Sequence, residues 1–130
     1  MNNPIEAMLQ QAIKVFQTGD LDLSKSILLK ILEIEPNEVN TLHMLGVIYK
    51  EEKQYDQSLF FLNQALALDG EFSKIHYNKG LLHYERCEYA EAIAHYNLAI
   101  KLEDNFQDAW LNKGNALRQQ ACTPNYSRLE

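Results

Sequence analysis

The stretch HYNKGLLHY, residues 76 to 84, returns in altered form as AWLNKGNAL, residues 109 to 117. The tripeptide Asn-Lys-Gly therefore occurs at residues 78–80 and again 34 residues later, at residues 112–114. A glycine inside a helix costs about 1 kcal/mol relative to alanine. A glycine that recurs at a fixed interval within an apolar, helix-like run therefore indicates a place where a side chain does not fit.

The same 34-residue interval extends along most of the chain. Gly46 precedes Gly80 and Gly114 at this spacing. Three other series are aligned in the same way: Tyr55 with Tyr89; Ile31 with Ala65 and Ala99; and Ile34 with Leu68 and Leu102. Within each unit the apolar residues are three and four apart, which predicts two amphipathic helices joined by a short polar break. Pro36 and Gly70 fall between the units and are typical helix terminators.

Composition excludes several classes of protein. The chain has 130 residues, 46% of them hydrophobic and 23% charged, which is typical of one globular domain. Its net charge of −6 disfavours nucleic acid and anionic membrane surfaces as partners. No leader sequence or membrane span is evident, and Cys87 and Cys122 lack a CxxC spacing, so we expect a cytoplasmic protein without disulfides.

The repeat resembles the tetratricopeptide repeat, whose pattern places Trp, Leu, Gly and Tyr on a first helix and Ala, Phe and Pro after them. The second unit matches at Leu42, Leu45, Gly46, Tyr49, Ser58, Leu62 and Ala65, and the third at His76, Gly80, His83, Ala92, Tyr96 and Ala99. The fourth begins with Trp110, Gly114 and Leu117, and the terminal proline survives only as Pro36.

This resemblance implies an all-α protein, a right-handed superhelical solenoid of antiparallel helix pairs with seven helices. It has three full repeats and the first helix of a fourth, which is either the start of that repeat or a capping helix. The predicted boundaries are N-terminal cap residues 1–4, repeats 5–38, 39–72 and 73–106, a C-terminal helix 107–121 and a tail 122–130. The resemblance further implies that two helices cross closely at each recurring glycine.

In such arrays the first helix of each unit lines a concave groove. The resemblance places in it Leu9, Gln10, Ile13, Phe16, His43, Met44, Val47, Lys50, Lys74, Tyr77, Asn78, Leu81, Tyr84, Leu111, Asn112, Asn115 and Arg118. The subset expected to bind a peptide is His43, Met44, Lys74, Tyr77, Asn78, Tyr84, Asn112, Asn115 and Arg118.

An asparagine amide both donates and accepts, so asparagines one repeat apart can bind the backbone of an extended peptide. Asn78 and Asn112 resemble the asparagine ladder of O-linked N-acetylglucosamine transferase repeats, whereas Gln10 and Met44 occupy the equivalent earlier positions. The alternative is that these asparagines only solvate the groove. The chaperone-tail clamp of some repeats is not matched, because Leu9, Ile13 and Met44 replace its polar residues and only Lys74 fits.

An enzyme confined to this chain is not expected. His76 and His83 lie two turns apart on one helix, about 10 Å, which is too far for one zinc ion. No catalytic motif is present, and we expect no cofactor, no catalytic residue and no metal. We therefore predict a protein–protein interaction scaffold that binds a protein or peptide. The alternative is an N-terminal substrate-docking or regulatory module of a larger glycosyltransferase-like enzyme.

The C-terminal helix suggests one further contact. Trp110 and Leu117 lie seven residues apart on one face of this helix, which has no second helix of its own repeat to cover it. An uncovered apolar strip favours self-association. We therefore expect a homodimer through the C-terminal helix, unless residues 122–130 fold back over the strip or the helix serves as a polar cap.

Overall fold

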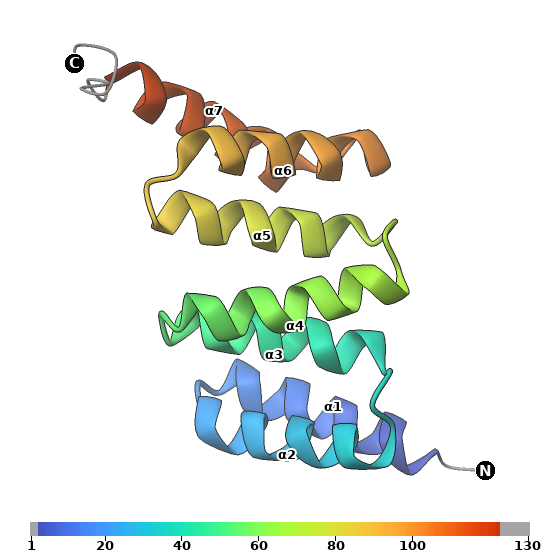
Figure 1. Cartoon of the computed structure of the whole chain (residues 1–130). Helices are drawn as coiled ribbons and strands as arrows, with labels where there is room; N and C mark the ends of the chain where they lie inside the picture. Colours follow the sequence, from blue (N-terminus) through green and yellow to red (C-terminus); the bar gives the residue numbers. More distant parts are fainter. Residues whose placement is uncertain (1–2, 123–130) are drawn as a thin grey trace. The chain divides into compact units, whose positions relative to one another are not determined.

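The computed structural model describes residues 3–122 of the chain, and the ordered elements in this range are seven α-helices with no strand (Figure 1). The prediction of an all-helical chain with seven helices is confirmed. The helices are α1 (Pro4–Gln17), α2 (Leu21–Ile34), α3 (Val39–Glu51), α4 (Tyr55–Leu68), α5 (Ser73–Glu85), α6 (Tyr89–Leu102) and α7 (Gln107–Cys122).

The chain divides into two compact units, one ending at Gly70 and the other beginning at Glu71. In the first unit α1 packs on α2 and α3 on α4, and α2 also contacts α3. In the second unit α5 packs on α6, and α6 packs on α7. Consecutive helices therefore form pairs, with α7 as an additional helix in the second unit.

Polar side chains define where several helices begin. Asn3 accepts a hydrogen bond from the Ile5 backbone N–H at 3.0 Å, and Pro4 occupies the first helical position. Asp20 and Glu38 cap α2 and α3 in the same way. Asn3 and Pro4 therefore define the start of α1.

Three left-handed residues end the first helices of the pairs. Gly19, Lys53 and Cys87 have φ angles of 89°, 61° and 61°, and they lie at the 34-residue interval. After each one, the next backbone N–H returns to a carbonyl five residues earlier, as Glu88 does to His83 at 2.8 Å. This geometry is a helix-terminating motif that favours glycine at the left-handed position. Of the three turns, only the first has a glycine at this position.

Small residues let the paired helices approach each other. An added Cβ at Gly46 would lie 2.5 Å from the Leu62 side chain, and one at Gly80 would lie 2.5 Å from the Tyr96 ring. Either distance is too short for two carbon atoms, so both glycines are required by close packing. The predicted reason for the recurring glycine is confirmed at these two positions.

Gly114 behaves differently. A Cβ added there would meet no atom within 4 Å. Leu62 and Tyr96 lie on the second helices α4 and α6, and within the described residues α7 has no second helix of its own repeat. The prediction that Gly114 marks a close helix crossing is therefore wrong in this structure.

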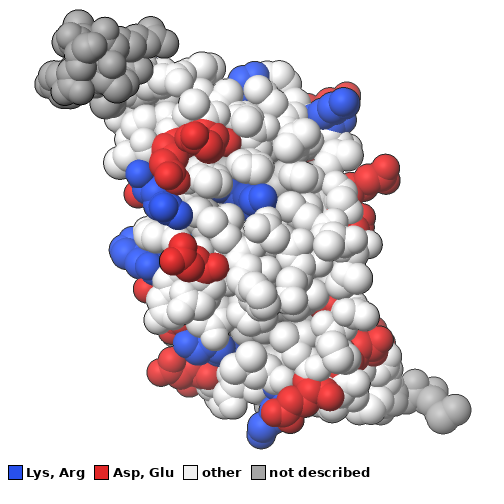
Figure 2. Space-filling view, in the orientation of Figure 1, with Lys and Arg blue, Asp and Glu red and all other residues white. Residues whose placement is uncertain are grey.

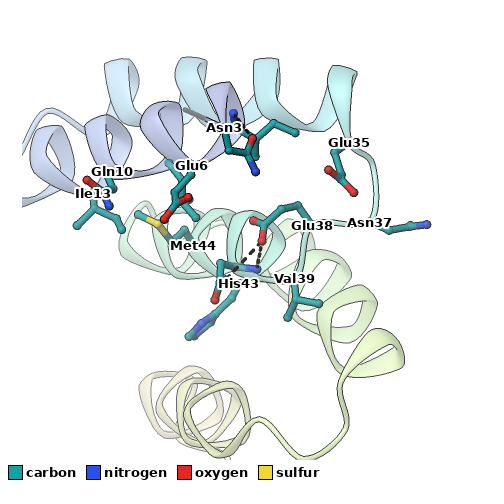
Figure 3. Close-up of a pocket in the computed structure, with 13 residues that line it drawn as sticks. Asn3, Glu6, Gln10, Ile13, Glu35, Asn37, Glu38, Val39, His43 and Met44 are labelled. Carbon is teal, nitrogen blue, oxygen red and sulfur yellow. Dashed lines mark hydrogen bonds between the residues drawn. The ribbon is translucent and has the colours of Figure 1, made fainter. Parts of the chain in front are cut away.

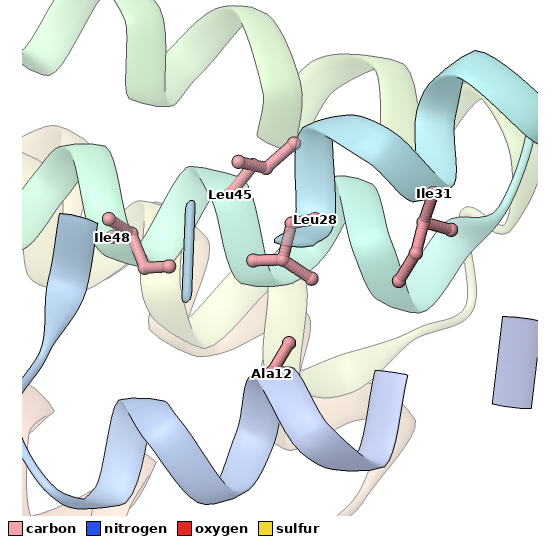
Figure 4. Close-up of a cluster of buried hydrophobic side chains, with 5 residues drawn as sticks. All are labelled: Ala12, Leu28, Ile31, Leu45 and Ile48. Atoms are coloured by element: carbon pink, nitrogen blue, oxygen red, sulfur yellow. The ribbon is translucent and has the colours of Figure 1, made fainter. Parts of the chain in front are cut away.

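The first unit has an apolar core made by three of its helices. Ala12 of α1, Leu28 and Ile31 of α2, and Leu45 and Ile48 of α3 are fully buried and face one another (Figure 4). Burying an aliphatic side chain of this size contributes about 1.5 to 3 kcal/mol. The hydrophobic effect therefore fixes α1 and α3 in this unit, and these two helices carry several of the predicted groove residues.

An ion pair joins the first and second predicted repeats. Lys25 Nζ on α2 lies 2.8 Å from Glu52 Oε1, just after α3, and 5.0 Å from the centre of the Tyr49 ring. The hydrogen bond to Glu52 raises the pKa of Lys25. The Lys25 side chain is thus mostly covered and binds the neighbouring repeat.

Candidate functional site

The predicted site residues of the second unit lie on α5 and α7. Asn112 Nδ2 donates one hydrogen bond to the Tyr77 hydroxyl and another to the Asp108 carbonyl, both at 2.9 Å. These bonds use both N–H groups of the amide and fix its orientation. Among the described residues no partner is found for Asn112 Oδ1, so this oxygen remains to accept a hydrogen bond from a ligand.

Tyr77 is held from several sides. Its ring contacts the rings of Tyr96 and Phe106, with centroids 5.8 Å and 4.9 Å apart. Burial and the nearby Asp108 carboxylate raise the pKa of Tyr77, so the phenol stays protonated at neutral pH. Tyr77 therefore acts mainly as a rigid support for Asn112.

The remaining predicted residues of α5 follow the helix at different depths. Lys74 is exposed near the start of α5, whereas Asn78 and Tyr84 are half-buried. The Tyr84 ring packs edge-on against Tyr89, with centroids 5.4 Å apart. Tyr84 and Asn78 therefore each show only part of their side chain to solvent.

On α7, Arg118 donates a hydrogen bond from Nη2 to Asn115 Oδ1. Arg118 is exposed and Asn115 half-buried. This bond turns the Asn115 amide so that its oxygen is occupied. The structure thus brings together two pairs of predicted site residues, Tyr77 with Asn112 and Asn115 with Arg118.

In the first unit, His43 and Met44 of α3 line a cleft against α1 (Figure 3). The cleft has a volume of about 760 Å³ and also contains Leu9, Gln10 and Ile13. All five residues belong to the surface that the repeat resemblance implied. Another residue of that predicted surface, Lys50, has a buried side chain, so its placement on an open groove is wrong.

The sequence did not identify the polar rim of this cleft. The rim includes Glu6 of α1 and two acidic residues of the α2–α3 connection, Glu35 and Glu38. Glu6 could have been found from the sequence, because it lies four residues before Gln10 and thus on the same helix face. Glu35 and Glu38 could not, because their position depends on the path of a connection between helices.

The histidines of the second unit form a packing cluster. His83 stacks on His95 with ring centroids 5.2 Å apart, and His83 Nδ1 lies 3.0 Å from Glu88 Oε1. Burial, together with the positive charges of Lys79, His83 and His76, lowers the pKa of His95 to about 4. In residues 3–122 no group of three or more His, Cys, Asp or Glu side chains is arranged to hold a metal ion.

The charge on the surface is mixed. On the face shown in Figure 2, acidic and basic side chains lie among large uncharged areas. None of the helices in residues 3–122 combines the length and the apolar character needed to cross a membrane.

Comparison with known proteins agrees with the repeat. Two family models described as tetratricopeptide repeat match residues 27–60 and 73–106, which together are just over half of the chain. Among curated protein sequences no match was found.

Several solved structures have the same fold. An O-GlcNAc transferase mutant from Thermobaculum terrenum aligns with a TM-score of 0.84 and 26% identity, over 90% of this chain but only 23% of the transferase. MamA aligns with a TM-score of 0.81 and 19% identity, over 91% of this chain and 64% of MamA. The first repeat domain of Spaghetti (RPAP3) was solved with the HSP90 peptide SRMEEVD. It aligns with a TM-score of 0.83 and 19% identity, over 90% of this chain and 93% of that domain.

These alignments show that proteins with very different sequences share the paired-helix arrangement described above. The alignments with MamA and the Spaghetti domain, each at 19% identity, concern the fold alone. The chain spans about a quarter of the transferase and about two thirds of MamA. The 34-residue interval, the seven paired helices and the two family matches lead to one conclusion: the chain belongs to the tetratricopeptide repeat family.

Proposed function

We propose that the chain is a protein interaction scaffold that binds an extended segment of a partner along the first helices of its repeats. The main support is Asn112, whose amide is fixed by Tyr77 and Asp108 and whose oxygen is left to accept a hydrogen bond. A fixed acceptor binds a backbone N–H without regard to the partner's side chains. Asn78 lies one repeat earlier at the equivalent position.

The other predicted residues give this surface its character. In the second unit Tyr77 and Tyr84 offer apolar area, and Lys74, Asn115 and Arg118 offer polar groups. In the first unit Met44 offers apolar area and His43 a polar group. Aromatic, methionine and arginine side chains are enriched where proteins bind one another. We propose that these residues contact the partner's side chains, while the asparagines contact its backbone.

The proposal includes no catalytic role for this chain. Tetratricopeptide repeats are in general scaffolds, and the neighbouring Spaghetti domain was solved with a peptide bound. That peptide is acidic, however, and the lysine and asparagine positions of a chaperone-tail clamp are apolar here at Leu9, Ile13 and Met44. A partner with different chemistry is therefore proposed for this chain.

A second candidate function rests on the transferase alignment, which combines 26% identity with coverage of 90% of this chain. In this alternative the repeats form the substrate-docking or regulatory part of a glycosyltransferase-like enzyme. The test is whether the natural gene encodes an α/β catalytic domain beyond residue 130. Both candidates require the same peptide-binding surface.

Binding is tested with peptides selected from a random display library by the intact chain. We expect Asn78→Ala combined with Asn112→Ala to weaken a selected peptide, because each lost hydrogen bond contributes about 0.5 to 1.5 kcal/mol. The matched control combines Asn63→Ala and Asn97→Ala on the second helices α4 and α6, where both asparagines are exposed. Equal affinity for the two double variants would leave the asparagines with a solvating role only.

A further inference from the structure

The cleft between α1 and α3 of the first unit differs chemically from the asparagine surface of the second unit. Its thirteen lining residues include three glutamates and no lysine or arginine (Figure 3). They also include the aliphatic side chains of Ile5, Leu9, Ile13, Val39 and Met44. The described part of this cleft is therefore both acidic and apolar.

The three carboxylates are not equivalent. Glu38 is fixed, because its Oε2 accepts hydrogen bonds from the Thr41 backbone N–H at 2.6 Å and from the Thr41 hydroxyl at 2.5 Å. Glu6 and Glu35 are exposed, and neither forms an ion pair with a described residue. Among the described residues that line the cleft, no lysine or arginine balances these negative charges.

Apolar side chains line the cleft along its length, with Met44 near Glu6 and Val39 near Glu38, but one end of it has no carboxylate (Figure 3). Figure 3 shows Gln10 and Ile13 at one end and Glu35 and Asn37 at the other, with Glu6 between them. Glu6 and Ile13 are seven residues apart on α1, which corresponds to about 10 Å along a helix. An extended peptide covers this distance in about three residues.

We propose that this cleft binds an extended peptide segment that carries a lysine or arginine and, about three residues away, an aliphatic side chain. The cation contacts the exposed carboxylates of Glu6 and Glu35, and the aliphatic group packs on Leu9, Ile13 and Met44. Gln10, exposed and without a hydrogen bond to any described residue, offers its amide to the peptide backbone between them. Glu38 adds negative charge but no free oxygen, because its Oε1 accepts from the Asn40 backbone N–H and Nδ2, each at 3.4 Å. This inference rests on the proposed scaffold function and specifies the chemistry of the partner.

An acidic segment does not fit the same cleft. A carboxylate placed near Glu6, Glu35 and Glu38 would meet three like charges, and like charges brought together at an interface disfavour binding. The cleft thus selects against the kind of peptide that the Spaghetti domain was solved with. Selectivity for a basic and aliphatic segment follows from both attraction and repulsion.

The test uses three fluorescein-labelled peptides and the intact chain, measured by fluorescence anisotropy. The first peptide has two lysines, two serines and two leucines in that order; the second replaces the lysines with glutamates, and the third replaces the leucines with serines. Measurement at physiological salt limits general attraction by the net charge of −6, because charges are screened beyond about 8 Å there. We expect the first peptide to bind at least about tenfold more tightly than either of the others.

Two pairs of variants locate the binding. Glu6→Lys should weaken the first peptide about tenfold, whereas Glu91→Lys, which changes the net charge equally and also lies in the first turn of its helix, should leave it within about twofold. Ile13→Ser should weaken it more than Leu29→Ser, since these side chains are 37% and 40% exposed but only Ile13 lines the cleft. Circular dichroism checks that each variant is folded.

Equal weakening by Glu6→Lys and Glu91→Lys, or preference for the glutamate peptide, would overturn the inference. If the first peptide fails while a library-selected peptide binds and depends on Asn78 and Asn112, the scaffold function stands and the chemistry assigned to this cleft is wrong. If no peptide of either kind binds, both proposals are wrong.

Discussion

The same tripeptide, Asn-Lys-Gly, has opposite surroundings in α5 and in α7. At Gly80 of α5 the ring of Tyr96 leaves no room for a Cβ, whereas a Cβ added at Gly114 of α7 would meet no atom of another element within 4 Å. Tyr96 is fully buried, so it cannot move aside easily. The comparison teaches that the glycine is a requirement of a helix pair, and that a lone first helix keeps the residue without the contact that requires it.

The largest expected effect comes from placing a side chain at the crowded glycine. Gly80→Leu forces the leucine against the buried Tyr96 ring and should lower the free energy of unfolding by about 1 to 3 kcal/mol. Urea denaturation followed by circular dichroism measures the change. Gly114→Leu is the matched control and should not lose stability, because leucine is a better helix former than glycine and a Cβ there meets no atom within 4 Å. Equal losses for the two variants would contradict the role assigned to the contact with Tyr96.

The α5–α6 pair should also lose stability in mild acid because of His95. Its folded pKa of about 4 lies below the ordinary 6.5, owing to burial and the neighbouring positive charges of Lys79, His83 and His76. The unfolded chain therefore binds a proton at a higher pH, and the stabilisation present above pH 6.5 is lost as the pH falls towards 4. Between pH 7.5 and 5.5 we expect a loss of about 1 kcal/mol.

The variant His95→Gln isolates this contribution. It retains the other histidines, so the part of the pH dependence that disappears belongs to His95. Denaturation at the two pH values should give a smaller loss for the variant than for the parent chain. The same loss in both proteins would contradict a depressed pKa at His95.

Much of the fold could be predicted from the sequence because one interval, 34 residues, aligns the residues that pack. The seven helices and the crowding at Gly46 and Gly80 followed from it. The left-handed turns at Lys53 and Cys87 were not predicted from this interval. Of the three equivalent positions, only Gly19 carries the residue type that favours this backbone geometry. Their spacing from Gly19 was the available signal.

The candidate site was less predictable than the fold. Helix position placed His43 and Met44 in a cleft of the first unit, as the repeat resemblance implied. Helix position could not show that the Asn112 amide donates a hydrogen bond to the Tyr77 hydroxyl, because that bond joins α5 to α7 across 35 residues. Nor could it place Glu35 and Glu38, whose positions are set by the α2–α3 connection.

A smaller effect of opposite sign is expected at the uncrowded glycine. Gly114→Ala adds a methyl group into open space within α7 and should raise the free energy of unfolding by about 0.5 to 1 kcal/mol. The gain should appear as a higher urea midpoint with an unchanged slope. A loss of stability would reveal a contact at Gly114 that the structure does not contain.

The smallest effect concerns the uncovered side of α7. The Trp110 indole N–H donates a hydrogen bond to the Asp104 backbone carbonyl at 2.8 Å. The side chain is 51% exposed, so its ring presents apolar area to solvent. We expect weak, concentration-dependent dimerisation through Trp110 and Leu117. The alternative, in which residues 122–130 fold back over this strip, concerns residues outside the described range, except for Cys122 at the end of α7.

Sedimentation velocity over a wide concentration range checks this expectation. Leu117→Ser should shift the monomer–dimer equilibrium towards monomer, whereas Leu68→Ser should not, although the two leucines are 46% and 45% exposed. A chain that stays monomeric at the highest concentration would rule out the dimer.

The claim that the first helices of the repeats bind the partner is tested most directly by NMR. Amide chemical shifts of the labelled chain are followed while a library-selected peptide is added. The account predicts that the shifted residues lie mainly on α1, α3, α5 and α7, with Met44 and Asn112 among the most affected. Shifts confined to α2, α4 and α6 would contradict it.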